Sequence, residues 1–412
     1  MSVRISKGRL IEFLVFMMLF LSSSFTVTNN IIGSSTTILL WLITLFIIVL
    51  YCNFFHIPIS VMSNSPLSIC CILIACIWIT DLFNRENLYT TGKNSFAFIT
   101  VTLFIYVASF DEFKRSYINV LLFLSMISLI CFFGYQLFPV LRELNLVKNT
   151  TGYLFSNIYI FVYNLLLARN CGMFWEPGAF GTFLCMAMLF ELTRDNPRIK
   201  YVIVFLASIV TTFSTSAYIA SLFIVLYYLF LKHRTKRRIR RLLLVLMAIL
   251  VVGIFVNYDA FFGTYGSSTV FGKLFRYYQG SSHIRHTSTS IRVNAVIYGL
   301  IAFFSSPVIG HGYAGLRNLL YEYTLGMNTC TFVNWFSVYG FIFGILMIVG
   351  YYRLSCYSNK KKYHIGSLLL FMIFFVITIS ENYVNSPVFI LLALYGYQIA
   401  GYKQMQKECE YV

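Results

Sequence analysis

The residues best suited to chemistry lie in the stretch "ARNCGMFWEPGAFG" (168–181). Arg169 stands seven residues before Glu176, and Pro177 and Gly178 lead into an apolar run. Proline is favoured in the first turn of a helix, and a carboxylate there meets the positive end of the helix dipole. The pattern therefore predicts a helix that starts at Glu176. A purely structural carboxylate would need no arginine beside it, so the pair favours a functional site.

A second group of cations lies in the segment 257–328. It comprises Lys273, Arg276, Arg285, Arg292 and Arg317 with His283, His286 and His311, against Asp259 and Glu322. The segment 142–176 adds Arg142, Lys148 and Arg169. Arginine forks bind phosphate oxygens bidentately and keep their charge when partly buried. We expect a diphosphate ligand here, while the alternative for any single arginine is contact with lipid phosphates.

The sequence predicts neither a metal site nor a cofactor. His283 and His286 have a spacing that could hold a metal, but no carboxylate or cysteine stands near them and Arg285 between them would repel a cation. The chain has no HExxH, GxSxG, P-loop or DxD motif. A metal-bound nucleotide-sugar donor therefore has no support.

Composition identifies the elements that must position these residues. The chain of 412 residues is 59% hydrophobic and 11% charged, about half the charge of a soluble domain. Apolar runs long enough for membrane helices recur from end to end. We predict an all-α polytopic membrane protein, a single integral membrane domain over 1–412. The expected spans are 10–28, 36–56, 65–80, 95–110, 117–141, 177–193, 199–214, 216–231, 242–256, 329–352, 365–380 and 386–401, about twelve in all.

Positive charges give the orientation. With both termini in the cytoplasm, the inward segments hold 21 of the 31 Lys and Arg residues, seven of them in "KHRTKRRIRR" (232–241). Cytoplasmic segments are enriched in Lys and Arg. The net charge of +17 is thus explained by the membrane, and no nucleic-acid partner is expected.

Segments 142–176 and 257–328 then become outward loops. Two stretches within them, 153–168 and 291–306, are almost long enough to span. Counting both as spans would turn the basic stretch 232–241 outward, so both stay in the loops. The apolar spacing of 291–306 predicts a short helix lying in the outer interface.

Two motifs resemble a known family. "RNCGMFWEPGAFG" is similar to the Arg-x-x-Gly-x-Phe-x-Glu-Pro segment of bacterial O-antigen polymerases, within the O-antigen ligase and polymerase superfamily. "IRVNAVIYGLIAFFSSPVIGHGYAGL" resembles that family's second signature, an arginine followed by an amphipathic stretch and Pro-x-x-Gly-x-Gly. One departure is Thr215, which stands where many relatives have an arginine, so that arginine's role cannot be transferred.

The resemblance implies an enzyme at the periplasmic face of the bacterial inner membrane. It would extend glycans carried on undecaprenyl diphosphate by transferring them to a hydroxyl of the next lipid-linked repeat unit. Arg169 and Arg292 would then stabilise the diphosphate charge, and Glu176 or His311 would orient or deprotonate the acceptor hydroxyl. Candidate substrate-binding residues are Arg276, Arg285, Arg317, Trp175 and Tyr313. The expected partners are the lipid-linked oligosaccharides, membrane lipids and, as a further candidate, a chain-length regulator protein.

Three alternatives stay open. An O-antigen ligase would use the same donor with lipid A–core as acceptor. A flippase for the same lipid-linked sugars should carry charges inside its spans, whereas here they gather in the outward loops. A passive structural membrane protein would have no use for the Arg169–Glu176 pair.

Overall fold

The computed structural model describes residues 6–23, 33–54, 64–148, 154–165, 168–231, 288–358, 364–379 and 381–409. The basic stretch 232–241, the span expected at 242–256 and the part of the large loop up to residue 287 lie outside them. Predictions for Arg276 and Arg285 therefore also lie outside the described residues.

Helices make up most of the described chain. In the first half they are α1 (Lys7–Ser22), α2 (Gly33–Phe54), α3 (Asn64–Phe83), α4 (Leu88–Val107), α5 (Phe110–Leu137), α6 (Val140–Glu143), α7 (Pro177–Leu192), α8 (Ile199–Thr212) and α9 (Thr215–Leu231). In the second half they are α12 (Ser288–Ser305), α13 (Tyr313–Leu319), α14 (Tyr321–Thr324), α15 (Thr331–Ser358), α16 (His364–Thr378) and α17 (Pro387–Cys409). Each expected span that falls on described residues overlaps one of these helices.

Length and composition separate the helices into two groups. Within the described residues, three are long and apolar enough to cross a membrane, over Ser65–Phe83, Phe110–Leu137 and Thr331–Ser358. Shorter apolar helices of 10–17 residues, such as Pro177–Leu192, accompany them. The total of about twelve spans therefore stays a prediction, while the mostly helical, apolar architecture is typical of a membrane protein.

The segment 142–176 corrects the prediction of an all-α fold. It contains an antiparallel four-stranded sheet in the order β1 (Leu146–Lys148), β2 (Leu154–Ile158), β3 (Phe161–Asn164) and β4 (Arg169–Gly172). The strands are only three to five residues long, and β2 and β3 form a hairpin in which Ile158 pairs with Phe161. Buried aromatic and aliphatic residues of these two strands gave the stretch 153–168 the apolar content of a near-span.

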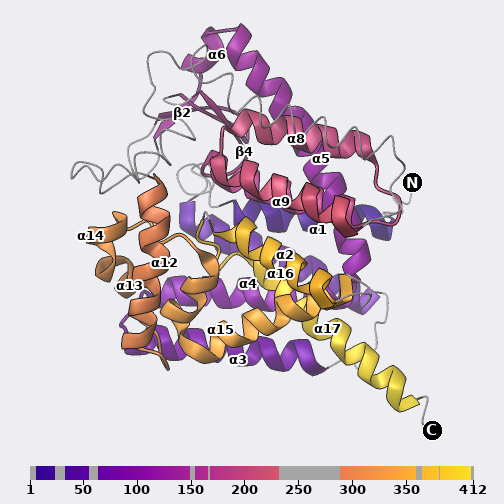
Figure 1. The fold of residues 1–412 in the computed structure, drawn as a ribbon, viewed down its shortest axis with the longest axis vertical. Coiled ribbons are helices and arrows are strands. Elements are labelled where there is room, and N and C mark those ends of the chain that lie inside the picture. Colours follow the sequence, from indigo (N-terminus) through magenta and orange to yellow (C-terminus); the bar gives the residue numbers. More distant parts are fainter. Residues whose placement is uncertain are drawn as a thin grey trace.

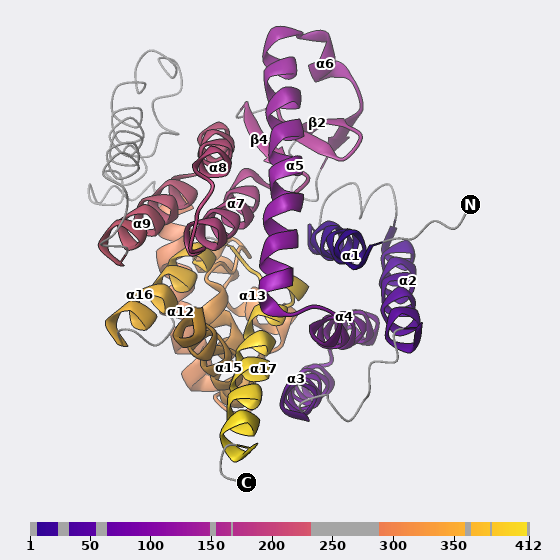
Figure 2. The ribbon, with the colours of Figure 1, turned by 90° about the vertical axis from the view of Figure 1, so that its right-hand side faces the viewer.

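Helix α5 divides the molecule. Figure 2 shows it running between α1–α4 on one side and α7–α9 on the other, with α6 and the sheet at its far end. A capping box fixes its start, because Ser109 Oγ accepts from the Glu112 backbone N–H and Glu112 accepts from the Ser109 N–H. In Figure 1 the helices α12–α14 lie together at one side, next to α15.

Helix α7 is the centre of the packing. All of its residues are buried, and it contacts α5, α8 and α9. Gly181 permits this, since a Cβ there would lie 2.5 Å from the Ala217 Cβ of α9. The close approach of α15 and α17 has a similar basis, because a Cβ on Gly350 would lie 2.5 Å from the Ala393 carbonyl oxygen. Glycine in apolar helices allows two backbones to meet.

The interfacial helix expected at 291–306 is helix α12. Its apolar residues Ile297, Leu300, Ile301 and Phe304 are 42–74% exposed, as expected for a face that contacts lipid. The opposite side packs on α15, where Ser337 Oγ donates to the Gly299 carbonyl over 2.7 Å. The position of α12 in the membrane interface remains a prediction.

Candidate functional site

Glu176 stands at the junction of the sheet and the central helix. The chain leaves β4 at Gly172, turns, and starts α7 with Glu176 at the N-cap and Pro177 in the first turn, as expected from the sequence. The Glu176 side chain makes no capping hydrogen bond to its own helix. The carboxylate therefore points to partners elsewhere in the fold.

One such partner is Glu381, which sequence reasoning missed. It lies in the turn between α16 and α17 and is only 7% exposed. Gly178 shows how close the two carboxyl groups are: a Cβ there would lie 2.7 Å from Glu381 Oε1 and 3.3 Å from Glu176 Oε1. Glycine in the Glu-Pro-Gly sequence thus leaves the space that both carboxyl groups occupy.

Two arginines complete the cluster. Arg292 of α12 places its Nη2 4.0 Å from Glu381 Oε1. Arg169 of β4 is partly buried and feels the charges of both Glu176 and Arg292. Three residues chosen from sequence, Arg169, Glu176 and Arg292, therefore lie close together in the fold, although Arg292 of α12 comes 116 positions after Glu176 in the sequence. We call Arg169, Glu176, Arg292 and Glu381 the Arg–Glu cluster.

Burial and charge set the protonation of this cluster. Burial raises the pKa of Glu381 well above its usual range, and the charge of Glu176 and a hydrogen bond between the two carboxyl groups raise that pKa further, against the opposing effect of Arg292. The raised pKa of Glu381 favours its neutral, protonated form. Burial lowers the pKa of Arg169, but an arginine keeps its proton in a protein. The site combines two cations with two carboxyl groups in contact with each other.

The start of α15 holds Glu381 in place. Thr331 Oγ1 donates to the Glu381 carbonyl over 2.9 Å and accepts from the Tyr383 N–H over 2.9 Å. The Cys330 N–H donates to the Ile379 carbonyl over 3.0 Å. Hydrogen bonds of Cys330 and Thr331 with backbone groups therefore hold the turn before, at and after Glu381.

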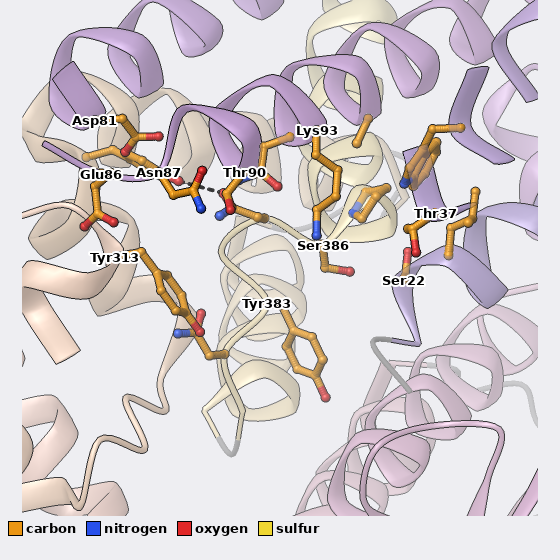
Figure 3. Close-up of a pocket in the computed structure, with 18 of the residues that line it drawn as sticks. Ser22, Thr37, Asp81, Glu86, Asn87, Thr90, Lys93, Tyr313, Tyr383 and Ser386 are labelled. Carbon is orange, nitrogen blue, oxygen red and sulfur yellow. Dashed lines mark hydrogen bonds between the residues drawn. The ribbon is translucent and has the colours of Figure 1, made fainter. Parts of the chain in front are cut away.

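A polar cavity of about 330 Å³ adjoins the cluster. Trp175 and Asn382 line it, and each precedes or follows a glutamate of the cluster by one residue. Its remaining walls come from α1, α2, α3, α4, α13, α15 and the start of α17, and from the α3–α4 and α16–α17 turns (Figure 3). Trp175 and Tyr313, both predicted to bind sugars, lie in this lining, and the Trp175 and Tyr383 rings are 5.8 Å apart.

The Pro-x-x-Gly-x-Gly motif (307–312) positions Tyr313. It docks onto α15 where Gly340, with φ +80°, interrupts the helix. The freed carbonyls of Ser337 and Val338 accept from the N–H groups of His311 and Gly312 over 2.9 and 3.0 Å. A Cβ on Gly310 or Gly340 would collide with the facing backbone, and both φ values are positive. The motif is therefore a backbone-to-backbone joint.

Comparison with known proteins identifies part of the chain. Residues 201–333 match the protein family described as O-antigen ligase. The chain carries an O-antigen ligase/polymerase family domain. This confirms the resemblance found in the sequence, and such domains act in polysaccharide biosynthesis. No match was found among curated proteins. The matched residues include Arg292, His311, Tyr313 and Arg317, whereas Arg169, Glu176 and Glu381 lie outside them.

In this domain His311 is held by its neighbours. Its Nε2 lies 2.9 Å from the Ala302 carbonyl oxygen and 2.9 Å from Ser305 Oγ, both near the end of α12. A carbonyl oxygen only accepts, so in the neutral imidazole Nε2 carries the proton and only Nδ1 can accept another. The arrangement gives His311 a clear structural use, and its expected role as a base rests on Nδ1.

The remaining predicted substrate-binding residues have different outcomes. Arg317 lies on α13 with its side chain exposed, and its Nε would be 3.0 Å from a Cβ on Gly326. Arg276 and Arg285 are outside the described residues. Within the part of the chain that the structure describes, no group of three or more His, Cys, Asp and Glu side chains gathers in a way that could hold a metal ion.

A sequence signal for Glu381 did exist. It is one of only 14 acidic residues, and it directly follows the apolar run 365–380, at the end expected to face outward. Asn382 and Asn385 follow it before Pro387 opens the next helix. A carboxylate at the outer end of a span, on the same side as the cationic loops, satisfies the criterion that selected Glu176.

Proposed function

We propose that this protein is an O-antigen polymerase, which joins oligosaccharide repeat units carried on undecaprenyl diphosphate at the periplasmic face of the inner membrane. The family domain at 201–333 and the two sequence motifs support the substrate class. The observation that carries the proposal is the Arg–Glu cluster beside a polar cavity lined by aromatic rings. The arginines can bind a diphosphate, the carboxyl groups can orient or deprotonate an acceptor hydroxyl, and the aromatic rings of the cavity wall can stack on sugars.

The proposed reaction is a displacement at the anomeric carbon of the donor. The acceptor hydroxyl oxygen forms the new bond, the bond from the anomeric carbon to the diphosphate oxygen breaks, and its electron pair leaves with the lipid diphosphate. Arg169 and Arg292 stabilise the charge that develops on that leaving group. The acceptor proton passes to Glu176, which its hydrogen bond with the Glu381 carboxyl group keeps oriented. His311, held near the end of α12 that is remote from Arg292, is the second candidate base.

The orientation follows from charge. Ten of the 31 Lys and Arg residues fall in the segments expected outside, and they include both arginines of the cluster. At the opposite end of α7, Arg194, Arg198 and Lys200 stand within seven residues. This distribution supports a cytoplasmic position for the α7–α8 turn and a periplasmic one for the cluster.

A ligase is the second candidate, because the matched family is described as O-antigen ligase. Ligase and polymerase would bind the same donor through the same arginines. They differ in the acceptor, which is lipid A–core for the ligase and a second lipid-linked repeat unit for the polymerase.

The Glu176→Ala variant in the native cell tests the proposal. We expect the ladder of long O-chains to disappear while core carrying a single repeat unit persists, because a separate ligase still works. Glu143→Ala, an exposed glutamate of the same outer segment, is the control and should leave the ladder intact at equal protein levels. If the core instead carries no repeat unit and long lipid-linked chains accumulate, the protein is a ligase and not a polymerase.

A further inference from the structure

The cavity beside the Arg–Glu cluster has the composition of a sugar-binding site. Trp41, Trp175 and Tyr383 supply aromatic surface, and Asn94 and Asn382 supply amides. Rings cover the apolar faces of ligands, and a few placed polar groups fix their orientation. The volume of about 330 Å³ falls within the range of roughly 300–1,000 Å³ typical of small-molecule sites.

The charged groups of the lining are not equivalent. Asp81 Oδ2 accepts from Thr91 Oγ1 over 2.6 Å, and Glu86 Oε1 accepts from the Ala314 N–H over 2.6 Å. Both acidic side chains are thus engaged in holding the walls together. Glu86 in particular joins the α3–α4 turn to the start of α13, next to Tyr313.

Lys93 differs from both carboxylates. It extends from α4 into the cavity on the side of Ser386, away from the end where Asp81 and Glu86 lie (Figure 3). Among the described residues, no carboxylate lies within ion-pair distance of its Nζ. An ammonium group carries three hydrogen-bond donors and a full charge. The cavity therefore presents a cation to whatever enters it.

We propose that this cavity binds sugar residues of the repeat unit and that Lys93 binds an acidic group on them, a carboxylate or a phosphate. The inference rests on the proposed function, since the cavity would seat the glycan whose hydroxyl or anomeric carbon reacts at Glu176. Trp175 connects the two sites, because it lines the cavity and precedes Glu176 directly. The α1–α4 helices, outside the matched family domain, would then contribute the selectivity for the glycan.

Variants of Lys93 in the native cell provide the first test. Lys93→Met keeps the length of the side chain and removes the charge, so we expect long O-chains to fall by about tenfold, the effect of losing one charge-assisted hydrogen bond. Lys93→Arg should restore most of the ladder. Lys114→Met removes a lysine that pairs with Asp111 at the other end of the bundle and should leave the ladder unchanged.

The outcomes separate the two proposals. A normal ladder in Lys93→Met cells, with no ladder in Glu176→Ala cells, overturns the role of Lys93 and leaves the polymerase intact. A normal ladder in both variants removes the proposed function as well. Loss of the protein from the membrane in Lys93→Met but not in Lys93→Arg cells would be a folding effect. In that case glucuronate binding to the wild type and to Lys93→Arg decides: glucuronate bound no more tightly than glucose, with pyrophosphate not bound either, overturns the proposal.

Binding to the purified protein identifies the acidic group. Tryptophan fluorescence would be titrated with sodium glucuronate, glucose and inorganic pyrophosphate. Tighter binding of glucuronate than of glucose, lost in Lys93→Met, supports a sugar carboxylate. A loss confined to pyrophosphate supports a phosphate group. Equal binding of all three probes to the wild type and to Lys93→Met overturns the proposal.

Discussion

The two ends of α7 carry one glutamate each, and the fold treats them differently. At the end toward α8, Glu191 is fully buried and accepts from the Arg198 backbone N–H, Nε and Nη2 over 2.6, 3.0 and 2.8 Å. Arg194 Nη1 adds a contact at 3.9 Å. At the end toward β4, Glu176 meets a second carboxyl group, Glu381, whose nearest arginine contact is 4.0 Å.

The difference shows what each end is for. Arg198, seven positions away, pairs with the charge of Glu191 and donates three hydrogen bonds to it. This ion pair stabilises the α7–α8 turn, and we call Glu191 and Arg198 the lock. The Arg–Glu cluster brings together two carboxyl groups and two guanidinium groups from four separate parts of the chain, and its Arg292–Glu381 contact is 4.0 Å long. Two guanidinium groups beside two carboxyl groups are chemically suited to bind the oxygens of an anion such as a phosphate.

Breaking the lock should give the largest effect on stability. Arg198→Ala leaves Glu191 buried without its main partner. Loss of one member of a buried pair costs about 3–5 kcal/mol. Because Arg198 is 31% exposed, we expect about 2–3 kcal/mol after allowing for solvent screening. The thermal denaturation midpoint in detergent and the amount of protein in membranes would measure it.

Arg194→Ala is the matched control for the lock. Its side chain is 35% exposed and its Nη1 lies 3.9 Å from Glu191 Oε2, so the free-energy cost of removing it should stay below about 1 kcal/mol. An equal loss in both variants would contradict a lock centred on Arg198. The polymer made per amount of folded Arg198→Ala protein should match the wild type.

The cluster should respond in activity and leave stability unchanged. Arg292→Lys keeps the charge but loses the fork, so we expect O-chain polymer to drop by about tenfold or more, nearly as far as in Arg292→Ala. Protein levels should stay the same. Arg85→Lys, an exposed arginine in the α3–α4 turn, is the control. Full activity in Arg292→Lys would show that Arg292 acts through its charge alone and not through a bidentate contact. Full activity in Arg292→Ala would show that Arg292 is not part of the site.

The smallest expected effect concerns the protonated carboxyl group. The pKa of Glu381 is raised in the fold, so the folded protein holds a proton that the unfolded chain has released above its own carboxyl pKa of about 4.3. Stability should then fall as pH rises from that value toward the raised pKa. Glu381→Gln imitates the neutral acid, so its denaturation midpoint should decline less over the same range.

Two companion results complete this measurement. Glu381→Ala loses the hydrogen bond to Glu176 and should cost about 1 kcal/mol relative to Glu381→Gln. Identical pH profiles for the wild type and Glu381→Gln would show that Glu381 is ionised in the fold. In that case the two carboxyl groups do not share a proton.

Much of the architecture could be predicted from sequence. The apolar runs located the helices because an apolar segment in a membrane must satisfy its backbone internally, and an α-helix does this within one segment. The start of α7 at Glu176 and Pro177 followed from local helix-capping chemistry. Arg169, Glu176 and Arg292 were chosen from residue type and from their side of the membrane, and the fold brings them together.

Other features depended on contacts between distant segments. The strands β1–β4 are too short to have a clear alternating pattern, and they are stabilised by pairing that no single segment encodes. Glu381 is 205 positions from Glu176 in the printed sequence, so its proton and its raised pKa exist only once α16, α17 and α7 pack together. His311 was chosen by its motif, and only the fold reveals its bonds to Ala302 and Ser305.

The sequence by itself determined the apolar, helical class of the protein, the helix positions, the bias in the distribution of positive charges and the residue types available at the end expected to face outward. The tertiary structure alone decided which charges are paired, which are crowded and which face a cavity. The physical reason is the distance along the chain over which each interaction acts. Helix formation and capping act within a few residues, whereas desolvation and pairing of a buried charge depend on every element packed around it.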